Sequence, residues 1–136
     1  MKHSKSSLFL MELIIALLFF SLASTVCIRL FVNAHSLSAQ TVDQNYAVNY
    51  AQNMAEAFIG CNGDLQTLQA LLSGSLLAED GMSLSLEQNG YRTDLMCNTA
   101  PEPGSTQSAD IRVCRTDAAD TPLYTLHVDL HIPHVR

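Results

Sequence analysis

Residues 8–28 read LFLMELIIALLFFSLASTVCI, and this stretch decides the fold at the N-terminal end of the chain. Its 21 residues hold one charged side chain, Glu12. A helix of that length rises about 32 Å at 1.5 Å per residue, which is enough to cross a hydrocarbon layer of about 30 Å. We therefore predict a membrane-spanning helix here, and this length argues against a wholly soluble cytoplasmic enzyme.

Charge differs sharply on the two sides of this stretch. The only two lysines, Lys2 and Lys5, precede it, whereas residues 30–136 carry four arginines and twelve acidic residues. Positive residues favour the cytoplasmic side of a membrane, so we expect a cytoplasmic N-terminus and an extracytoplasmic C-terminal domain. The acidic balance also disfavours nucleic-acid binding, which needs clustered lysines and arginines.

Several kinds of N-terminal segment contain an apolar stretch. A cleaved secretory signal has an apolar core of about 7–15 residues, which is shorter than this one, although a cut after Ala34 is conceivable. A lipoprotein signal needs a small residue before its cysteine. Here Val26 precedes Cys27, which argues against a lipoprotein signal. An ordinary single-pass anchor leaves Glu12 unexplained, because a carboxylate inside a membrane helix costs a few kcal/mol and is usually paired.

Residues 7–18, SLFLMELIIALL, resemble the N-terminal segment of type IV prepilins and of type II secretion pseudopilins. In that family a membrane peptidase removes a short basic leader, and the new N-terminus is methylated. A glutamate four residues later pairs with the terminal amine of a neighbouring subunit. The resemblance implies cleavage between Ser7 and Leu8, with Glu12 as the assembly glutamate. The family nearly always has Gly before the cut and usually Phe after it, and this chain departs from both.

The resemblance implies a structural subunit in the cell membrane, divergent or minor within its family, with no enzymatic activity and no cofactor. It would belong to a type IV pilus, a type II secretion system or a competence-type filament. Its partners would be other pilin-like subunits, joined through the N-terminal helix, together with the prepilin peptidase and the membrane. Two alternatives stay open: an unprocessed single-pass ectodomain that binds a partner, and a small secreted domain released by signal peptidase.

The helix is expected to continue beyond the membrane with one apolar face. No proline or glycine interrupts residues 8–59, and Gly60 is a reasonable terminator. The apolar face recurs at steps of three and four and consists of Ala47, Ala51, Met54, Ala55 and Phe58. The predicted organisation is a basic leader (1–7), a membrane and assembly helix (8–29), the solvent half of that helix (30–60) and a small exported α+β domain (61–136).

The exported domain is expected to begin with a short helix. Asp64 is placed to cap it, Gly74 to end it, and its apolar stripe is Leu65, Leu68, Leu71 and Leu72.

Alternating residues then predict strands over 83–87 and 91–97, joined by the hairpin signal Asn89-Gly90. Residues 100–109 read as a loop, Ile111 and Val113 as a third strand, and residues 117–122 as a turn. In the last strand, one face is expected to hold Tyr124, Leu126, Val128, Leu130 and Ile132. The predicted fold class is α+β: a long helix packed, by its Ala47–Phe58 face, on an antiparallel meander of about four strands.

Few residues suggest chemistry. His127, Asp129 and His131 share a strand face with zinc-binding residue types, but alternation with solvent produces such a face anyway, so we predict no metal site. Glu79-Asp80 reads as a solvated turn. Arg112 and Arg115 are expected to balance Asp110 and Asp117 rather than to form a binding patch.

The cysteines allow at most one disulfide on the exported side. Cys27 lies in the membrane stretch, which leaves three exported cysteines, an odd number. Cys97 and Cys114 are the first choice for a pair, because they lie on adjacent predicted strands around the polar loop. Pairing of Cys61 with either of them, or three free thiols, stays open.

Overall fold

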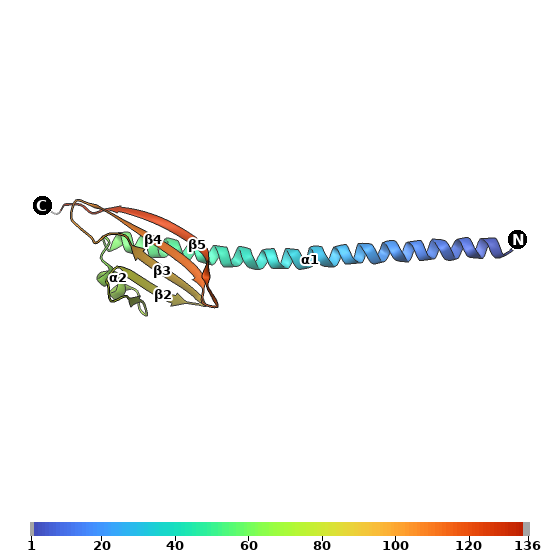
Figure 1. Ribbon diagram of the computed structural model, residues 1–136, viewed down its shortest axis with the longest axis horizontal. Helices are drawn as coiled ribbons and strands as arrows, with labels where there is room; N and C mark the ends of the chain where they lie inside the picture. Colours follow the sequence, from blue (N-terminus) through green and yellow to red (C-terminus); the bar gives the residue numbers. More distant parts are fainter. Residues whose placement is uncertain (1, 135–136) are drawn as a thin grey trace. The chain divides into compact units, whose positions relative to one another are not determined.

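The computed structural model describes residues 2–134, with the side chains of residues 5–134. The chain divides into two compact units between Thr41 and Val42, and helix α1 (Lys2–Gly60) belongs to both. The second unit also contains α2 (Leu65–Leu71), β1 (Leu76–Leu77), β2 (Ser83–Gln88), β3 (Tyr91–Cys97), β4 (Thr106–Arg115) and β5 (Ala118–His131) (Figure 1). Residues 42–60 therefore fold together with the domain predicted from residue 61.

The predicted long helix is confirmed, and it begins before the apolar stretch. Residues 2–7 contain no proline or glycine, so nothing in this leader stops the helix from extending toward the N-terminus. Met1 and the side chains of residues 2–4, including that of Lys2, lie outside the described part, whereas Lys5 is exposed.

The C-terminal end of α1 differs in detail from the prediction. Gly60 is the last helical residue, but the left-handed backbone falls at Asn62, with φ of 52°, and Gly63, with φ of 78°. The Gly63 N–H donates to the Phe58 carbonyl at 3.1 Å, which closes the helix end. A Cβ on Gly63 would collide with the side-chain oxygen of Gln107, so a side chain is excluded there for two reasons.

The sheet is an antiparallel meander of five strands in the order β1-β2-β3-β4-β5. The prediction of about four strands is close, and the difference is the two-residue strand β1. The β2–β3 hairpin is confirmed at the predicted turn. Asn89 and Gly90 both have positive φ, 52° and 81°, as a type I′ turn requires.

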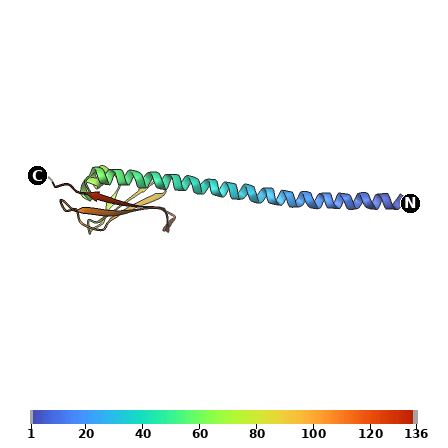
Figure 2. The same ribbon diagram turned by 90° about the horizontal axis from the view of Figure 1, so that it is seen from above.

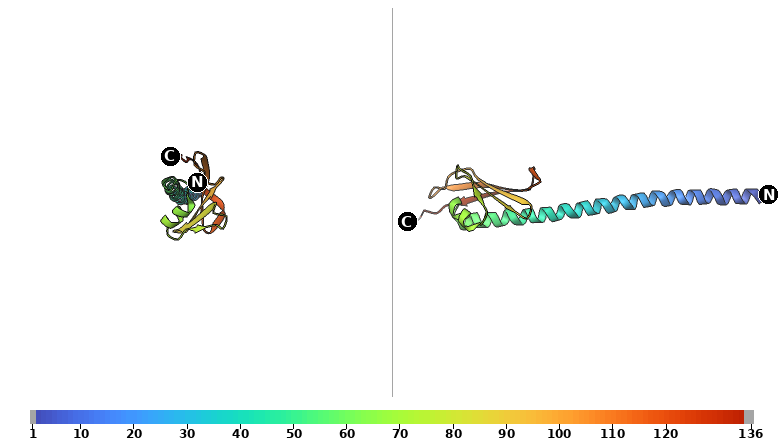
Figure 3. Two further views of the ribbon diagram at one scale, coloured as in Figure 1. Left: turned by 90° about the vertical axis from the view of Figure 1, so that its left-hand side faces the viewer. Right: turned by 90° about the horizontal axis from the view of Figure 1, so that it is seen from below.

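The core lies between the sheet and residues 47–58 of α1, as predicted. Ala47, Ala51 and Phe58 are fully buried on the helix side, and Leu95 and Ile111 on the strand side. Figure 2 shows this part of α1 lying along one face of the sheet, and the views in Figure 3 agree. We call the face of the sheet that α1 covers the inner face, and the opposite face the outer face.

The short helix α2 is confirmed with two corrections, of which the first is that it ends at Leu71 and not at Gly74. Asp64 caps it, accepting hydrogen bonds from the Gln66 N–H at 3.1 Å and from the Thr67 hydroxyl. Leu65 and Leu68 are buried. Leu71 does not belong to the apolar stripe, because the helix ends at that residue and its side chain is 64% exposed.

Two predicted loops are partly strand. The predicted loop 100–109 is wrong at its end, because β4 begins at Thr106, and β4 pairs in continuous register from Thr106↔His131 to Val113↔Tyr124. The predicted turn 117–122 is also wrong, because β5 already begins at Ala118. A register shift at residues 113–115 accommodates the extra residues and places Cys114 opposite Pro122.

Candidate functional site

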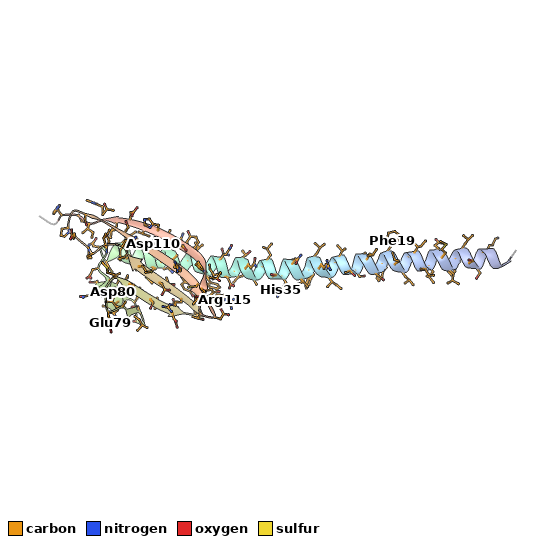
Figure 4. The ribbon with its side chains drawn as sticks, in the orientation of Figure 1. Phe19, His35, Glu79, Asp80, Asp110 and Arg115 are labelled. Carbon is orange, nitrogen blue, oxygen red and sulfur yellow. The ribbon has the colours of Figure 1, made fainter. Side chains whose placement is uncertain are left out.

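The apolar half of α1 is unshielded within the structure. Every Leu, Ile, Val, Phe and Met between Leu8 and Val32 is at least 47% exposed. In Figure 4, Phe19 and His35 project outward from the helix. α1 is long and apolar enough to cross a membrane. An apolar surface of this size is unfavourable in water, and it marks a region that lipid or the apolar side chains of a partner cover.

The hydroxyl groups in this stretch are satisfied by the helix itself. Ser21, Ser24 and Thr25 donate to the carbonyls of the residues four positions earlier, at 2.8–2.9 Å. They therefore carry little penalty in an apolar surrounding. Glu12 is different, because it is exposed and makes no hydrogen bond or ion pair with any side chain described here. It is the group in this stretch that still requires a partner.

The predicted processing residues lie on α1 in exposed positions. Ser7 and Leu8 are both helical and exposed, with Leu8 at 65%. Cleavage between them stays a prediction, as does the role of Glu12.

The outer face of the sheet carries a polar network centred on His127. His127 Nδ1 lies 2.6 Å from Asp110 Oδ1, and its Nε2 lies 3.2 Å from Asp129 Oδ1. Ser108 donates to Asp129 at 2.6 Å, and Asn98 to Asp110 at 3.3 Å. The predicted polar face of the last strand is thus present, but both ring nitrogens of His127 already contact carboxylates. Across residues 2–134, no three histidine, cysteine or acidic side chains converge in a way that would hold a metal ion.

Raising the pH is expected to remove the stabilising contribution of His127. The hydrogen bond to Asp110, aided by the charge of Asp129, raises the pKa of His127 above 6.5, and the same pairing lowers the pKa of Asp110. A group with a raised pKa in the folded state stabilises fully below its unfolded pKa and loses this effect as pH rises through the folded value. The difference in Tm between the parent and His127→Gln should therefore be largest near about pH 5.5 and vanish above the raised pKa.

NMR titration of the His127 ring checks the cause of this pH dependence. Asp110→Asn should bring the pKa of His127 back toward 6.5, and Asp129→Asn should lower it by less. A parent pKa at or below 6.5 would contradict the network.

The predicted Cys97–Cys114 disulfide is wrong, and all four cysteines are free thiols. In the β3–β4 register, Cys97 faces Ala109 and Cys114 faces Arg92. Five residues of strand separate the two positions, about 17 Å at 3.3 Å per residue, far beyond the reach of a disulfide. Burial raises the pKa of the Cys97 thiol to about 11, so this thiol stays protonated and unreactive at neutral pH.

A cluster at the N-terminal end of the second unit was not predicted from the sequence. Asp43 on α1 accepts a hydrogen bond from the Tyr91 hydroxyl at 2.7 Å and pairs with Arg115 at 3.1 Å. This bond raises the pKa of Tyr91 to about 12 and, with Arg115, lowers the pKa of Asp43. The rings of Tyr46 and Tyr50 each lie 5.7 Å from the ring of Tyr91. These contacts join residues 48 and 72 positions apart, which no local pattern reveals.

The two neighbouring arginines differ in their partners. Arg115 pairs with Asp117 at 3.0 Å, as predicted. Arg112 forms no ion pair with Asp110, which is bound by His127 and Asn98, but the charge of Arg112 contributes to the lowered pKa of Asp110, as the predicted charge balance implies. The side chain of Arg112 makes no hydrogen bond or ion pair with any residue in the described range.

Comparison of the chain with models of protein families, with curated proteins and with solved structures finds no match.

Proposed function

We propose that the chain is a pilin-like or pseudopilin-like structural subunit of a membrane-anchored filament or secretion complex. Residues 8–29 of α1 would anchor it, with the N-terminus cytoplasmic and the sheet domain extracytoplasmic. The observation that carries the proposal is the unshielded apolar half of α1, which holds one carboxylate, Glu12, that pairs with no described side chain.

The chemistry of that half favours assembly over simple anchoring. Lipid covers exposed leucine and phenylalanine side chains, but it offers no counter-charge to a carboxylate at membrane depth. A terminal amine on the neighbouring helix supplies that charge, and a cut between Ser7 and Leu8 would create one. The cut and the glutamate therefore belong to the same proposal, since each explains the other.

The second unit supports the same assignment. Its core is completed by residues 47–58 of α1, so the anchoring helix and the exported domain share one covalent element. Residues 42–60 of this helix are therefore part of the fold of the exported domain itself.

The proposal predicts processing between Ser7 and Leu8. The intact mass of the membrane-extracted chain should show loss of residues 1–7 and gain of one methyl group. A peptidase that accepts only a small residue before the cut should process Ser7→Gly faster than the parent and should fail on Ser7→Leu. Ser21→Leu, the same replacement within the membrane stretch, is the matched control and should leave processing unchanged.

The same mass measurement decides between the proposal and its alternatives. An intact leader in the parent and in Ser7→Gly, in cells that process ordinary prepilins, would establish the unprocessed anchored ectodomain. Loss of 34 residues would establish a secreted domain released by signal peptidase.

A further inference from the structure

The outer face of the sheet carries a groove of about 480 Å³, a volume within the range of ligand sites. It lies in the second unit, on the side of the sheet that α1 does not cover. The strand register aligns Leu76, Ser85, Asp94, Arg112 and Thr125 in one row across all five strands. Met96 belongs to the next row, opposite Asp110.

One part of the groove is apolar. Leu76 is 72% exposed and Met96 is 56% exposed, although both lie on the solvent side of the sheet, where neighbouring positions are polar. Methionine adapts its shape readily and is frequent on binding surfaces. Covering these two side chains would remove apolar surface from water.

The other part carries a guanidinium, that of Arg112, which forms no ion pair with any described residue. Both carboxylates that line the groove already have cationic partners: Asp94 pairs with Arg92 at 2.9 Å, and Asp110 with His127 at 2.6 Å. The guanidinium of Arg112 also lines the groove and has no such partner within residues 2–134. Two of the four arginines after residue 30 line this groove, in a chain of net charge −6. The groove is therefore suited to an incoming carboxylate flanked by apolar side chains.

The chain itself presents such a segment. Glu79-Asp80 is the one adjacent pair of acidic residues in the sequence, and Figure 4 shows both on the turn that follows β1. The Asp80 carboxylate stabilises the turn by accepting a hydrogen bond from the Met82 N–H at 2.9 Å. The Glu79 carboxylate is exposed and makes no hydrogen bond or ion pair with any described residue. Leu76 and Met82, 72% and 36% exposed, flank the pair. A turn that is already ordered loses little conformational entropy on binding.

We propose that the groove binds the Glu79 turn of a second copy of this chain, with Glu79 of one copy paired to Arg112 of the other and the exposed Leu and Met side chains in contact. A surface of this size makes a weak contact, which becomes effective when both copies are held in one membrane at high local concentration. The contact rests on the membrane anchoring in the proposed function for its high local concentration, but it involves only the second unit and needs neither Glu12 nor the cut after Ser7.

Photo-crosslinking in membranes of cells that express the full chain tests the proposal. A benzophenone amino acid at exposed Thr125, at the end of the Arg112 row, should give a covalent dimer whose crosslink maps to residues 76–82 of the second copy. Arg112→Glu should lower the dimer yield roughly tenfold through like-charge repulsion, and Glu79→Arg should do the same. Combining the two variants restores opposite charges and should restore the yield. Glu102→Arg, on an exposed loop outside the groove, is the matched control and should change nothing.

Several results would overturn this contact. One is a crosslink that maps elsewhere or reaches only lipid. Another is a dimer yield that Arg112→Glu leaves unchanged, and a third is a combined variant whose dimer yield stays low. Tyrosine fluorescence melts of each variant establish folding, and Glu79→Arg, in an exposed turn, keeps the test decisive if Arg112→Glu is destabilised.

Discussion

Replacing Phe58 with aspartate is expected to unfold the second unit at physiological temperature. The Phe58 side chain projects from α1 into the core against the sheet and is fully buried. Truncating a buried phenylalanine costs about 3–5 kcal/mol, and an unpaired carboxylate in the same site adds a desolvation penalty. The total is comparable with the whole stability of a small domain, about 5–15 kcal/mol.

Tyrosine fluorescence provides the measurement for this variant. The chain has no tryptophan, and all four tyrosines lie in the second unit, so their emission reports on that unit. Glu56→Lys is the matched control, because Glu56 is exposed on the same helix two residues away and should change stability by less than about 0.5 kcal/mol. Equal losses in the two variants would mean that the buried face of α1 is assigned wrongly.

Replacing Glu12 with alanine is expected to abolish co-assembly while leaving membrane insertion intact. Insertion becomes easier, because the variant loses a carboxylate that costs a few kcal/mol at membrane depth. Assembly suffers, because the terminal amine of the neighbouring subunit then stays unpaired in an apolar surrounding, and breaking a buried ion pair costs about 3–5 kcal/mol.

Two further variants separate charge from size at this position. Glu12→Gln keeps the shape but removes the charge, and should assemble as poorly as Glu12→Ala. Glu12→Asp keeps the charge and should retain part of the assembly. Lysine-independent chemical crosslinking in membranes, with carbonate extraction to confirm insertion, is the readout. Normal complexes in Glu12→Ala would remove the assembly role, and Glu12 would then need another partner.

The elements that were predicted correctly are those with a local cause. An unbroken run without proline or glycine makes α1, Asp64 caps α2, and Asn89-Gly90 supplies the positive φ angles of the hairpin. The Ala47–Phe58 face was also predictable, because helical periodicity places those residues on one side whatever covers them.

The errors have a common physical origin in contacts between distant residues. The start of β4 reads as a loop because its residues are polar and small, and only pairing with β5 makes Thr106 to Ser108 a strand. The predicted Cys97–Cys114 disulfide is wrong because two residues on neighbouring strands can still lie far apart along the strand direction, and only the register fixes that separation. Arg112 and Asp110 are two residues apart on one strand face, yet Asp110 bonds across the ladder to His127.

The contacts of Asp43 also have a mechanical consequence. Among the described residues, Asp43 is the most N-terminal one whose side chain bonds to the sheet, through Tyr91 and Arg115. A pull on α1 at residue 42 would therefore load the contacts of Asp43 with Tyr91 and Arg115 before it loads the buried residues from Ala47 to Phe58.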